Sequence, residues 1–253
     1  MFRYFASLMI AVLATSAVRA VQADDAAKAT IEKAIKATGW DKRKGDYASW
    51  KSKGKMNALG QEIEFAGDWK VDTAKSRYRM DLKINFGGME LDLMHVYDGE
   101  KAFEAAGGMK QDVEGPKLEY TKGTAARYRI MSLKPLLTDK QYTLTSVPAK
   151  DVNGKPAVGV KVEAPGTSPV TMYFDKETSL PVKAESTVKN EFDDWKDVLD
   201  ESYFGDWKDA GNGTKEYKTM KVVRGGTTLM ESTMSDYVVS EKPDWLAKAF
   251  VKP

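Results

Sequence analysis

The sequence predicts a mainly β protein with a few helices (α+β). We expect a single curved antiparallel sheet of about eleven strands, an open, incomplete β-barrel with helices packed in its concave side. Two observations predict it. Apolar and polar residues alternate with a period of two along most of the chain, and glycine-containing turn pairs separate the alternating runs. One helical stretch, residues 117–137, interrupts the strands.

Residues 1–23 predict a secretory signal peptide. Arg3 precedes an apolar run over residues 5–13, and small residues then lead to Ala-x-Ala-like ends at Ala20 and Ala23. We expect cleavage after Ala23, which leaves residues 24–253 as one domain in the periplasm; an uncleaved N-terminal anchor is the alternative. No Cys follows the cleavage site, so a bacterial lipoprotein anchor is excluded.

The composition excludes several classes of function. With no Cys and one His, the chain has no disulfide framework, no thiol nucleophile and no multi-histidine metal cage. Removing residues 1–23 takes away Arg3 and Arg19 and no acid, which leaves 37 basic against 37 acidic residues. A neutral exported chain predicts no nucleic-acid partner and no electrostatic attachment to anionic membranes.

The mature chain is expected to begin with a helix over residues 24–38. Asp24 or Asp25 can cap its start, and Gly39 can end it. Four residues fall on one face of this helix and predict its buried side: Ile31, Ala34, Ile35 and Thr38.

The alternation is clearest over residues 77–86, where one face is apolar and the other is charged or polar. The apolar face is expected to point into the concavity, and the face with Arg77, Arg79, Asp81, Lys83 and Asn85 toward water. Residues 89–93 continue the pattern after Gly87-Gly88. The other expected strands are residues 50–56, 63–71, 101–106, 142–147, 157–162, 170–174, 180–188, 217–223 and 228–239. Residues 191–209, acidic and aromatic, are interpreted as a long hairpin tip.

The helical stretch over residues 117–137 carries an apolar stripe at helical spacing, formed by Ala126, Ile130, Leu133 and Leu137. Pro135 kinks or ends this helix. We expect the stretch to act as a lid that covers the open side of the cavity and moves to admit ligand. The alternative is a helix packed permanently in the core.

The apolar inventory indicates a ligand-binding cavity. Several of the 12 Met residues share strand faces with aromatic or aliphatic residues, and Met suits surfaces that adapt to variable apolar partners. The same pattern is also compatible with an ordinary core. The residues expected to line the cavity are Phe65, Tyr78, Met80, Leu82, Ile84, Phe86, Met89, Leu91, Leu93, Met172 and Phe174.

Catalytic signatures are absent from the sequence. It contains no G-x-S-x-G, H-E-x-x-H, P-loop or G-x-G-x-x-G motif. His95 is either a base in a pocket or, as we expect, a hydrogen-bonded or solvated residue at the sheet rim. We therefore expect no catalytic residue, no metal, no cofactor and no enzymatic activity.

Four strings resemble the periplasmic lipoprotein-carrier family, the LolA/LolB-like or outer-membrane lipoprotein-sorting proteins. They are the helix end Ala37-Thr38-Gly39-Trp40, residues 173–183 with their Asp-x-x-Thr-x-Leu-Pro core, the closing hairpin over residues 217–237, and the tail from Asp244-Trp245 to Phe250 and Pro253. Ser179 stands where the family commonly has Gly.

The resemblance implies an open β-barrel whose helices cover an apolar cavity that takes acyl chains. The function expected from it is a soluble periplasmic carrier or binder of lipidated or acyl-chain ligands. Lipid or lipoprotein acyl chains are the expected partners, a membrane-bound donor or acceptor protein is a further candidate, and a monomer is expected. The alternatives are an envelope adaptor or sensor domain that binds another protein, and an enzyme that uses the same cavity.

Overall fold

The computed structural model describes residues 24–58, 60–211 and 213–252. The predicted signal peptide, residues 1–23, lies outside the described residues. In chain order the helices are α1 (Asp25–Thr38), the 3-10 helix η1 (Trp40–Lys42), α2 (Gly115–Met131), α3 (Pro135–Thr138) and α4 (Leu246–Ala249). The strands are β1 (Tyr47–Ala58), β2 (Gln61–Asp72), β3 (Arg77–Phe86), β4 (Met89–Tyr97), β5 (Ala102–Ala106), β6 (Met109–Val113), β7 (Thr143–Val152), β8 (Lys155–Glu163), β9 (Val170–Asp175), β10 (Pro181–Asn190), β11 (Lys196–Gly211), β12 (Thr214–Arg224) and β13 (Thr227–Ser240).

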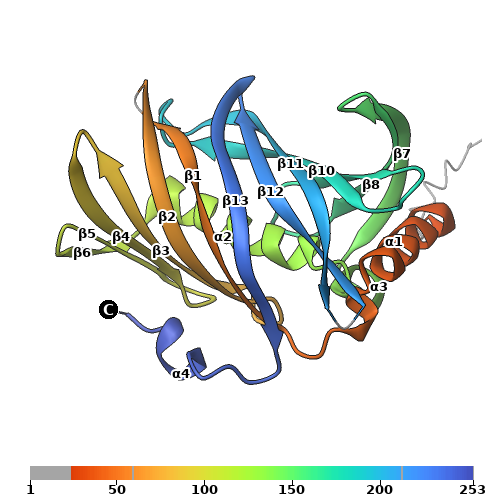
Figure 1. The fold of residues 1–253 in the computed structure, drawn as a ribbon, viewed down its shortest axis with the longest axis horizontal. Coiled ribbons are helices and arrows are strands. Elements are labelled where there is room, and N and C mark those ends of the chain that lie inside the picture. Colours follow the sequence, from red (N-terminus) through yellow and green to blue (C-terminus); the bar gives the residue numbers. More distant parts are fainter. Residues whose placement is uncertain (1–23, 59, 212, 253) are drawn as a thin grey trace, which may run out of the picture.

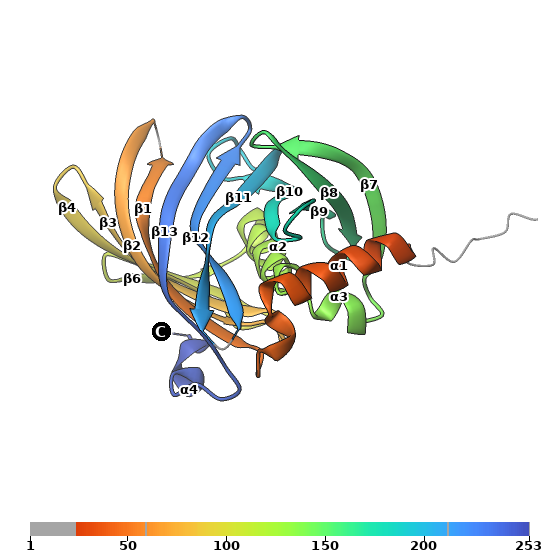
Figure 2. The ribbon, with the colours of Figure 1, turned by 45° about the vertical axis from the view of Figure 1, so that its right-hand side comes forward.

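All thirteen strands form one antiparallel sheet in the order β6-β5-β4-β3-β2-β1-β13-β12-β11-β10-β9-β8-β7. Strands β6 and β7 are the two edges and do not pair with each other, so the sheet curls without closing (Figure 1). It wraps around α2, with α1 and α3 at one end of the concavity (Figure 2). The predicted fold class, a curved open sheet with helices inside, is confirmed.

The strand register shows which side chains lie on each of the two faces of the sheet. We call the face that packs against α1, α2 and α3 the inner face, and the opposite one the outer face. On β3 the inner face carries Tyr78, Leu82 and Ile84, all less than 10 % exposed, whereas Lys83 and Asn85 on the outer face are exposed. The alternation read over residues 77–86 is therefore confirmed. The C-terminal tail packs on the outer face, where the Arg77 guanidinium lies 4.5 Å from the Phe250 ring.

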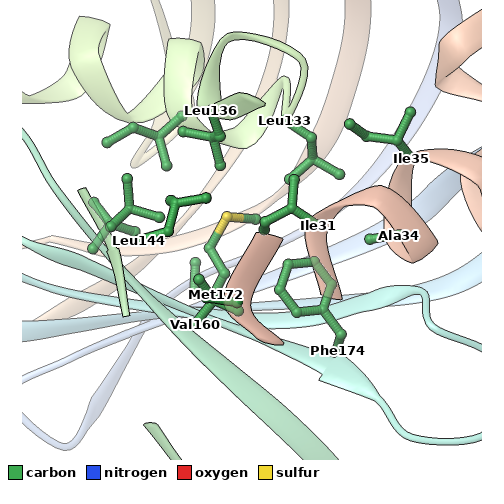
Figure 3. Packing of buried hydrophobic residues seen from close by; sticks show 14 of the residues in the cluster. Ile31, Ala34, Ile35, Leu133, Leu136, Leu144, Val160, Met172 and Phe174 are labelled. Carbon is green, nitrogen blue, oxygen red and sulfur yellow. The ribbon is translucent and has the colours of Figure 1, made fainter. Parts of the chain in front are cut away.

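The first helix forms as its sequence predicts. The Asp24 carboxylate accepts hydrogen bonds from the backbone N–H groups of Ala26 and Ala27, and Gly39 ends α1 in the left-handed conformation. The predicted face is fully included in the buried set, which is Ala27, Ile31, Ala34, Ile35 and Thr38. This face packs on β8 and β9 to form the main core (Figure 3).

Two strands were missing from the sequence-based prediction. Strand β6 is short and exposed except at Val113, so it shows no apolar alternation, although Gly107-Gly108 before it is a turn pair like those used elsewhere. The hairpin tip predicted over residues 191–209 is confined to the turn at residues 191–195, and the prediction is wrong from Lys196 on, where β11 begins. Strand β11 is a central strand whose inner face carries the buried Asp200, while Leu199 on the outer face is 49 % exposed.

Candidate functional site

Cross-strand rows of apolar side chains cover the inner face of β13 and β1–β4. We call the end of the sheet that holds the β1–β2, β3–β4 and β12–β13 turns the hairpin end. Nearest to it, Met56 lies between Met230 and Ile63, and Phe86 pairs with Met89. The next row crosses five strands and holds Ser232, Gly54, Phe65, Ile84 and Leu91. The third holds Met234, Ser52, Gly67, Leu82 and Leu93. We call these three rows the inner apolar surface.

Nine of the eleven residues predicted to line a cavity share this inner face. Phe65, Leu82 and Ile84 are buried, whereas Phe86, Leu91 and Leu93 are half-buried and Met89 is 69 % exposed. Tyr78 and Met80 lie deeper, in the rows that reach α2. Exposure therefore increases toward the hairpin end, and the surface is most accessible there.

Met172 and Phe174 lie in a different cluster from the other nine. They are 1 % and 0 % exposed and pack against Ile31 and Ala34 of α1, as Figure 3 shows. The alternation of residues along the strand correctly predicted that both lie on the inner face. It could not show that α1 covers that half of the sheet. The two halves differ: the β7–β11 half is packed core, and the β1–β4 half is partly exposed.

An aromatic layer separates the inner apolar surface from the deeper core. The Trp50 ring is stacked with those of Trp69 and Tyr237, with centroids 6.1 Å and 5.9 Å away, and the Tyr128 ring of α2 meets Trp50 edge-on at 5.8 Å. Burial raises the pKa of Tyr128 to about 12, so its hydroxyl stays neutral at physiological pH. Sequence reasoning missed this layer because the residues come from four separate elements.

The predicted lid residues do not form one continuous stripe. Ile130 and Leu133 are 1 % and 0 % exposed, but Ala126 is half-buried and Leu137 is 37 % exposed. Leu133 has φ +63°, which breaks the helix between α2 and α3. A stripe drawn through one uninterrupted helix is therefore wrong. The break shifts the phase, so that Leu136 is buried in place of Leu137, and on α2 the buried alanine is Ala125, not Ala126.

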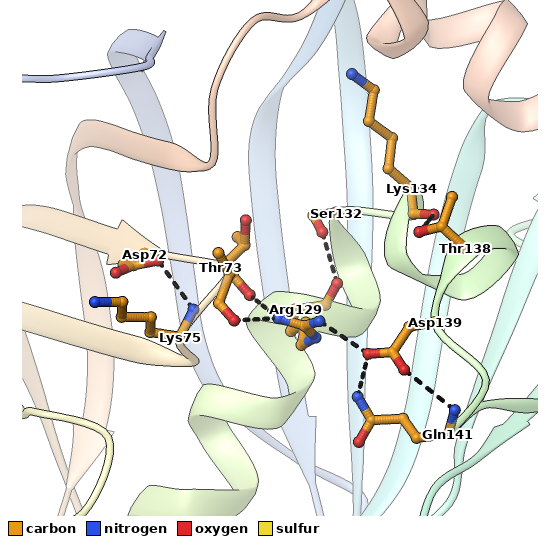
Figure 4. A network of polar contacts seen from close by, with 10 residues as sticks. Asp72, Thr73, Lys75, Arg129, Ser132, Lys134, Thr138, Asp139 and Gln141 are labelled. Carbon is orange, nitrogen blue, oxygen red and sulfur yellow. Dashed lines mark hydrogen bonds and ion pairs between the residues drawn. The ribbon is translucent and has the colours of Figure 1, made fainter.

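The C-terminal half of α2 is held firmly. The Arg129 guanidinium donates hydrogen bonds to the carbonyl oxygens of Thr73 and Ala74 in the β2–β3 turn and to Asp139, with the Asp139 contact at 2.9 Å (Figure 4). Together with the burial of Ile130, these bonds fix this half of the helix to the sheet.

The N-terminal half of α2 is held by side-chain contacts alone to two parts of the sheet. Lys117 Nζ lies 2.5 Å from Glu104 Oε2 on β5, and Thr121 Oγ1 lies 3.1 Å from His95 Nε2 on β4. On the other side, Arg224 Nη2 of β12 donates to the Tyr120 hydroxyl at 3.1 Å. This part of α2 thus spans the concavity between two regions of one sheet.

His95 is a half-buried residue whose side chain is 12 % exposed. Its ring stacks on Tyr78 with centroids 5.5 Å apart, and burial lowers its pKa from 6.5 to about 4 even though Glu104 lies nearby. As expected from the sequence, His95 is hydrogen-bonded, and its partner is the Thr121 hydroxyl.

Two hollows of about 590 Å³ and about 1040 Å³ are lined by residues from both faces of the sheet. Outward-pointing residues of both signs line them, among them Lys51, Asp68 and Asp81 in the first and Lys55 and Glu64 in the second. The first hollow is also lined by the third row of the inner apolar surface, which is Met234, Ser52, Gly67, Leu82 and Leu93. The side chains of that surface are most exposed at the hairpin end.

Within the part of the chain that the structure describes, no three His, Asp or Glu side chains come together as a metal site. Nor does any helix in those residues have the length and apolarity to cross a membrane.

The comparisons with known proteins concern the fold. No protein-family model and no curated protein matches the chain in sequence. A LolA superfamily protein from Nitrosomonas europaea superposes with a TM-score of 0.58 at 12 % identity, over 89 % of this chain and 97 % of that one. A DUF1329 family protein from Desulfovibrio piger gives 0.54 at 10 % identity, over 87 % and 95 %.

A Vibrio parahaemolyticus domain described as outer membrane lipoprotein-sorting gives a TM-score of 0.51 at 12 % identity, over 84 % of this chain and 92 % of that one. At such low identity the agreement concerns architecture. It confirms, at the level of the fold, the resemblance read from the four sequence strings: this chain has a LolA-like fold.

Proposed function

We propose that the protein is a binder or carrier of acyl-chain ligands in the cell envelope, and that the chain is bound on the inner apolar surface. The observation that carries this proposal is the mostly apolar inner face of β13 and β1–β4, interrupted by Ser52 and Ser232, which becomes exposed toward the hairpin end. A water-soluble domain rarely leaves such a face uncovered without a partner. The LolA-like fold supports the same class of function.

The energetics are adequate for this role. Burial of each methylene stabilises binding by about 0.8 kcal/mol, so a dozen methylenes offset the entropy of association. The half-buried Met56, Met230 and the exposed Met89 are flexible side chains that can repack around chains of different shape.

We further propose that the N-terminal half of α2 is the mobile lid. Besides the packing of Leu118, its contacts to the sheet are the polar pairs of Lys117 with Glu104, Thr121 with His95 and Tyr120 with Arg224. The C-terminal half is anchored by the buried Ile130 and by Arg129. The Lys117–Glu104 ion pair, whose side chains are 35 % and 18 % exposed, breaks at smaller free-energy cost than a packed core.

Binding is tested with oleate, by displacement of a fluorescent fatty acid and by native mass spectrometry. Leu91→Asp places a charge on the inner apolar surface and should reduce affinity at least tenfold, because the ligand would then bury a carboxylate. Met94→Asp is the matched control, since it lies on the same strand but on the outer face. The proposal fails if wild-type protein binds no oleate, or if both variants bind as tightly as wild type.

The lid is tested by cross-linking in a chain that has no native Cys. Glu104→Cys with Lys117→Cys, joined by a short bismaleimide, ties α2 to β5. The control pair, Lys83→Cys with Glu90→Cys, replaces an outer-face cross-strand ion pair of 2.8 Å. Oleate uptake should slow in the first protein only. Equal uptake rates in the two cross-linked proteins would show that α2 is not a lid.

A further inference from the structure

Arg224 is a charged residue at the hairpin end of an otherwise apolar stretch of the inner face. On β12 the residues Met220, Val222 and Arg224 point to this face, and Val222 pairs with Met230, a member of the inner apolar surface. Arg224 is therefore one step beyond that surface, beside the Gly225-Gly226 turn. Its side chain is only 8 % exposed.

The guanidinium is held in a fixed orientation. Nε donates to Asp200 Oδ1 at 2.8 Å, and Nη2 donates to the Tyr120 hydroxyl at 3.1 Å. The guanidinium carbon lies 5.4 Å from the centre of the Tyr120 ring. Asp200, also 8 % exposed, thus occupies the Nε side.

Arginine carries five N–H donors, of which these contacts use two. Nη1 and the second N–H of Nη2 have no hydrogen-bond partner among the described residues. They form the end of the guanidinium fork that faces away from the Asp200 contact. A fork of this kind fits the paired oxygens of a carboxylate or a phosphate.

We propose that Arg224 binds the anionic head group, carboxylate or phosphate, of the acyl-chain ligand. This inference rests on the proposed function and specifies which amphiphiles the surface accepts. The acyl chain lies along the row that contains Met230 and Met56, and the head group meets the free edge of the Arg224 fork at the hairpin end. A mostly apolar site with one placed polar group is the usual design for orienting an amphiphile.

The arrangement also links head-group binding to α2. Arg224 also donates to the Tyr120 hydroxyl, so the residue proposed to bind the head group is in direct contact with the mobile half of α2. Asp200 opposes binding of an anion by repulsion, and its fixed place on the Nε side directs the head group to the Nη1 edge.

The test compares the affinities of wild-type protein for oleate, for oleoyl lysophosphatidate and for the uncharged oleyl alcohol. At least one anionic amphiphile should bind about tenfold or more tightly than the alcohol, the range expected for hydrogen bonds to a charged group. Inorganic phosphate at millimolar concentration is the fourth probe and should not displace oleate, because it lacks the acyl chain.

Two variants separate recognition from folding. Arg224→Lys keeps the charge but removes the fork, and should lose most of the preference for the anion. Arg224→Met combined with Asp200→Leu replaces the ion pair by apolar side chains of similar size, a change that is often neutral for stability. This double variant should bind oleyl alcohol as wild type does and show no preference for the anions.

The outcomes distinguish the two proposals. If wild-type protein binds none of the three amphiphiles, the proposed function is wrong and this inference with it. If it binds the alcohol as tightly as the anions, or if the double variant keeps the preference, only the role of Arg224 is wrong. Displacement of oleate by inorganic phosphate would instead indicate a free-anion site and would also overturn the head-group role.

Discussion

Thr121 Oγ1 on α2 lies 3.1 Å from Nε2 of His95 on β4. The contact joins a helix to a strand 26 positions earlier in the chain, and burial lowers the pKa of His95 to about 4, so the imidazole is neutral at physiological pH. Glu104, Lys117 and Tyr78 also face this ring. Protonation of this ring is therefore linked to the stability of the folded protein.

The first prediction concerns acid stability. The pKa of His95 is about 4 in the folded protein against 6.5 for an ordinary His, so between these values the unfolded chain binds a proton that the folded chain does not. The contribution of neutral His95 to the unfolding free energy is fully present above pH 6.5 and is lost as the pH falls toward 4. Between pH 7.5 and pH 5 the unfolding free energy should fall by about 2 kcal/mol, as measured by urea denaturation.

The control for this prediction is His95→Gln, which cannot titrate and should lack the decrease above pH 5. The net pKa of Glu104 is lowered: burial opposes the shift, but Lys117 and Gln111 outweigh it. The stability that the ionised Glu104 contributes is therefore lost only as the pH falls below 4.5, the ordinary pKa of Glu. Parallel losses in wild type and variant between pH 7.5 and pH 5 would contradict the assignment to His95.

The second prediction concerns the junction of α2 and α3. Leu133 is 0 % exposed and packs with the residues of α1, so Leu133→Ala should cost about 2–5 kcal/mol of unfolding free energy. Leu137→Ala, four residues later and 37 % exposed, is the matched control and should cost less than about 1 kcal/mol. Equal losses in chemical denaturation would mean that the junction is not part of the core.

The third prediction concerns the seam between β1 and β13. A Cβ at Gly54 would lie 2.0 Å from the carbonyl oxygen of Glu231, so the two strands approach too closely for any side chain. Gly54→Ala should therefore destabilise the protein by more than about 3 kcal/mol, since backbone must move.

Gly123→Ala, in the interior of α2, is the opposite case. A Cβ there meets only Arg127 Nη1 at 3.9 Å, and removal of a helical glycine should stabilise the protein by up to about 1 kcal/mol. Thermal unfolding of both variants checks the pair. A Gly54→Ala protein with the wild-type midpoint would show that the strands at this seam can separate freely.

The fourth prediction concerns export. We propose that the chain is cleaved after Ala23 and that the mature protein is periplasmic. Asp24 would then be the first residue, and in the structure its N–H donates to Leu144 and its carboxylate accepts from Ser146 N–H and caps α1. N-terminal sequencing of periplasmic protein should return Asp24, or Val21 if the earlier site is used. Protein that begins at Met1 would refute the proposal.

The features that were predictable from sequence are those encoded by neighbouring residues. The cap and buried face of α1, the alternation over β3 and the turn at Gly87-Gly88 depend on spacings within one element. Ser179 is a related case. It was noted as standing where the family commonly has Gly, and its φ of +58° is one that Gly adopts without strain.

What only the tertiary structure decided depends on residues far apart in the chain. Strand β11 was missed because its inner face carries Asp200, and this carboxylate is acceptable there only because Arg224 pairs with it from the next strand. The inner face is divided into a packed β7–β11 half and a partly exposed β1–β4 half because α1 packs on only one of them. The spacing of residues within a strand does not indicate where α1 packs. The order of burial along a strand is therefore readable from sequence, but the partner that covers each face is not, because a side chain's environment is set by every element that packs against it.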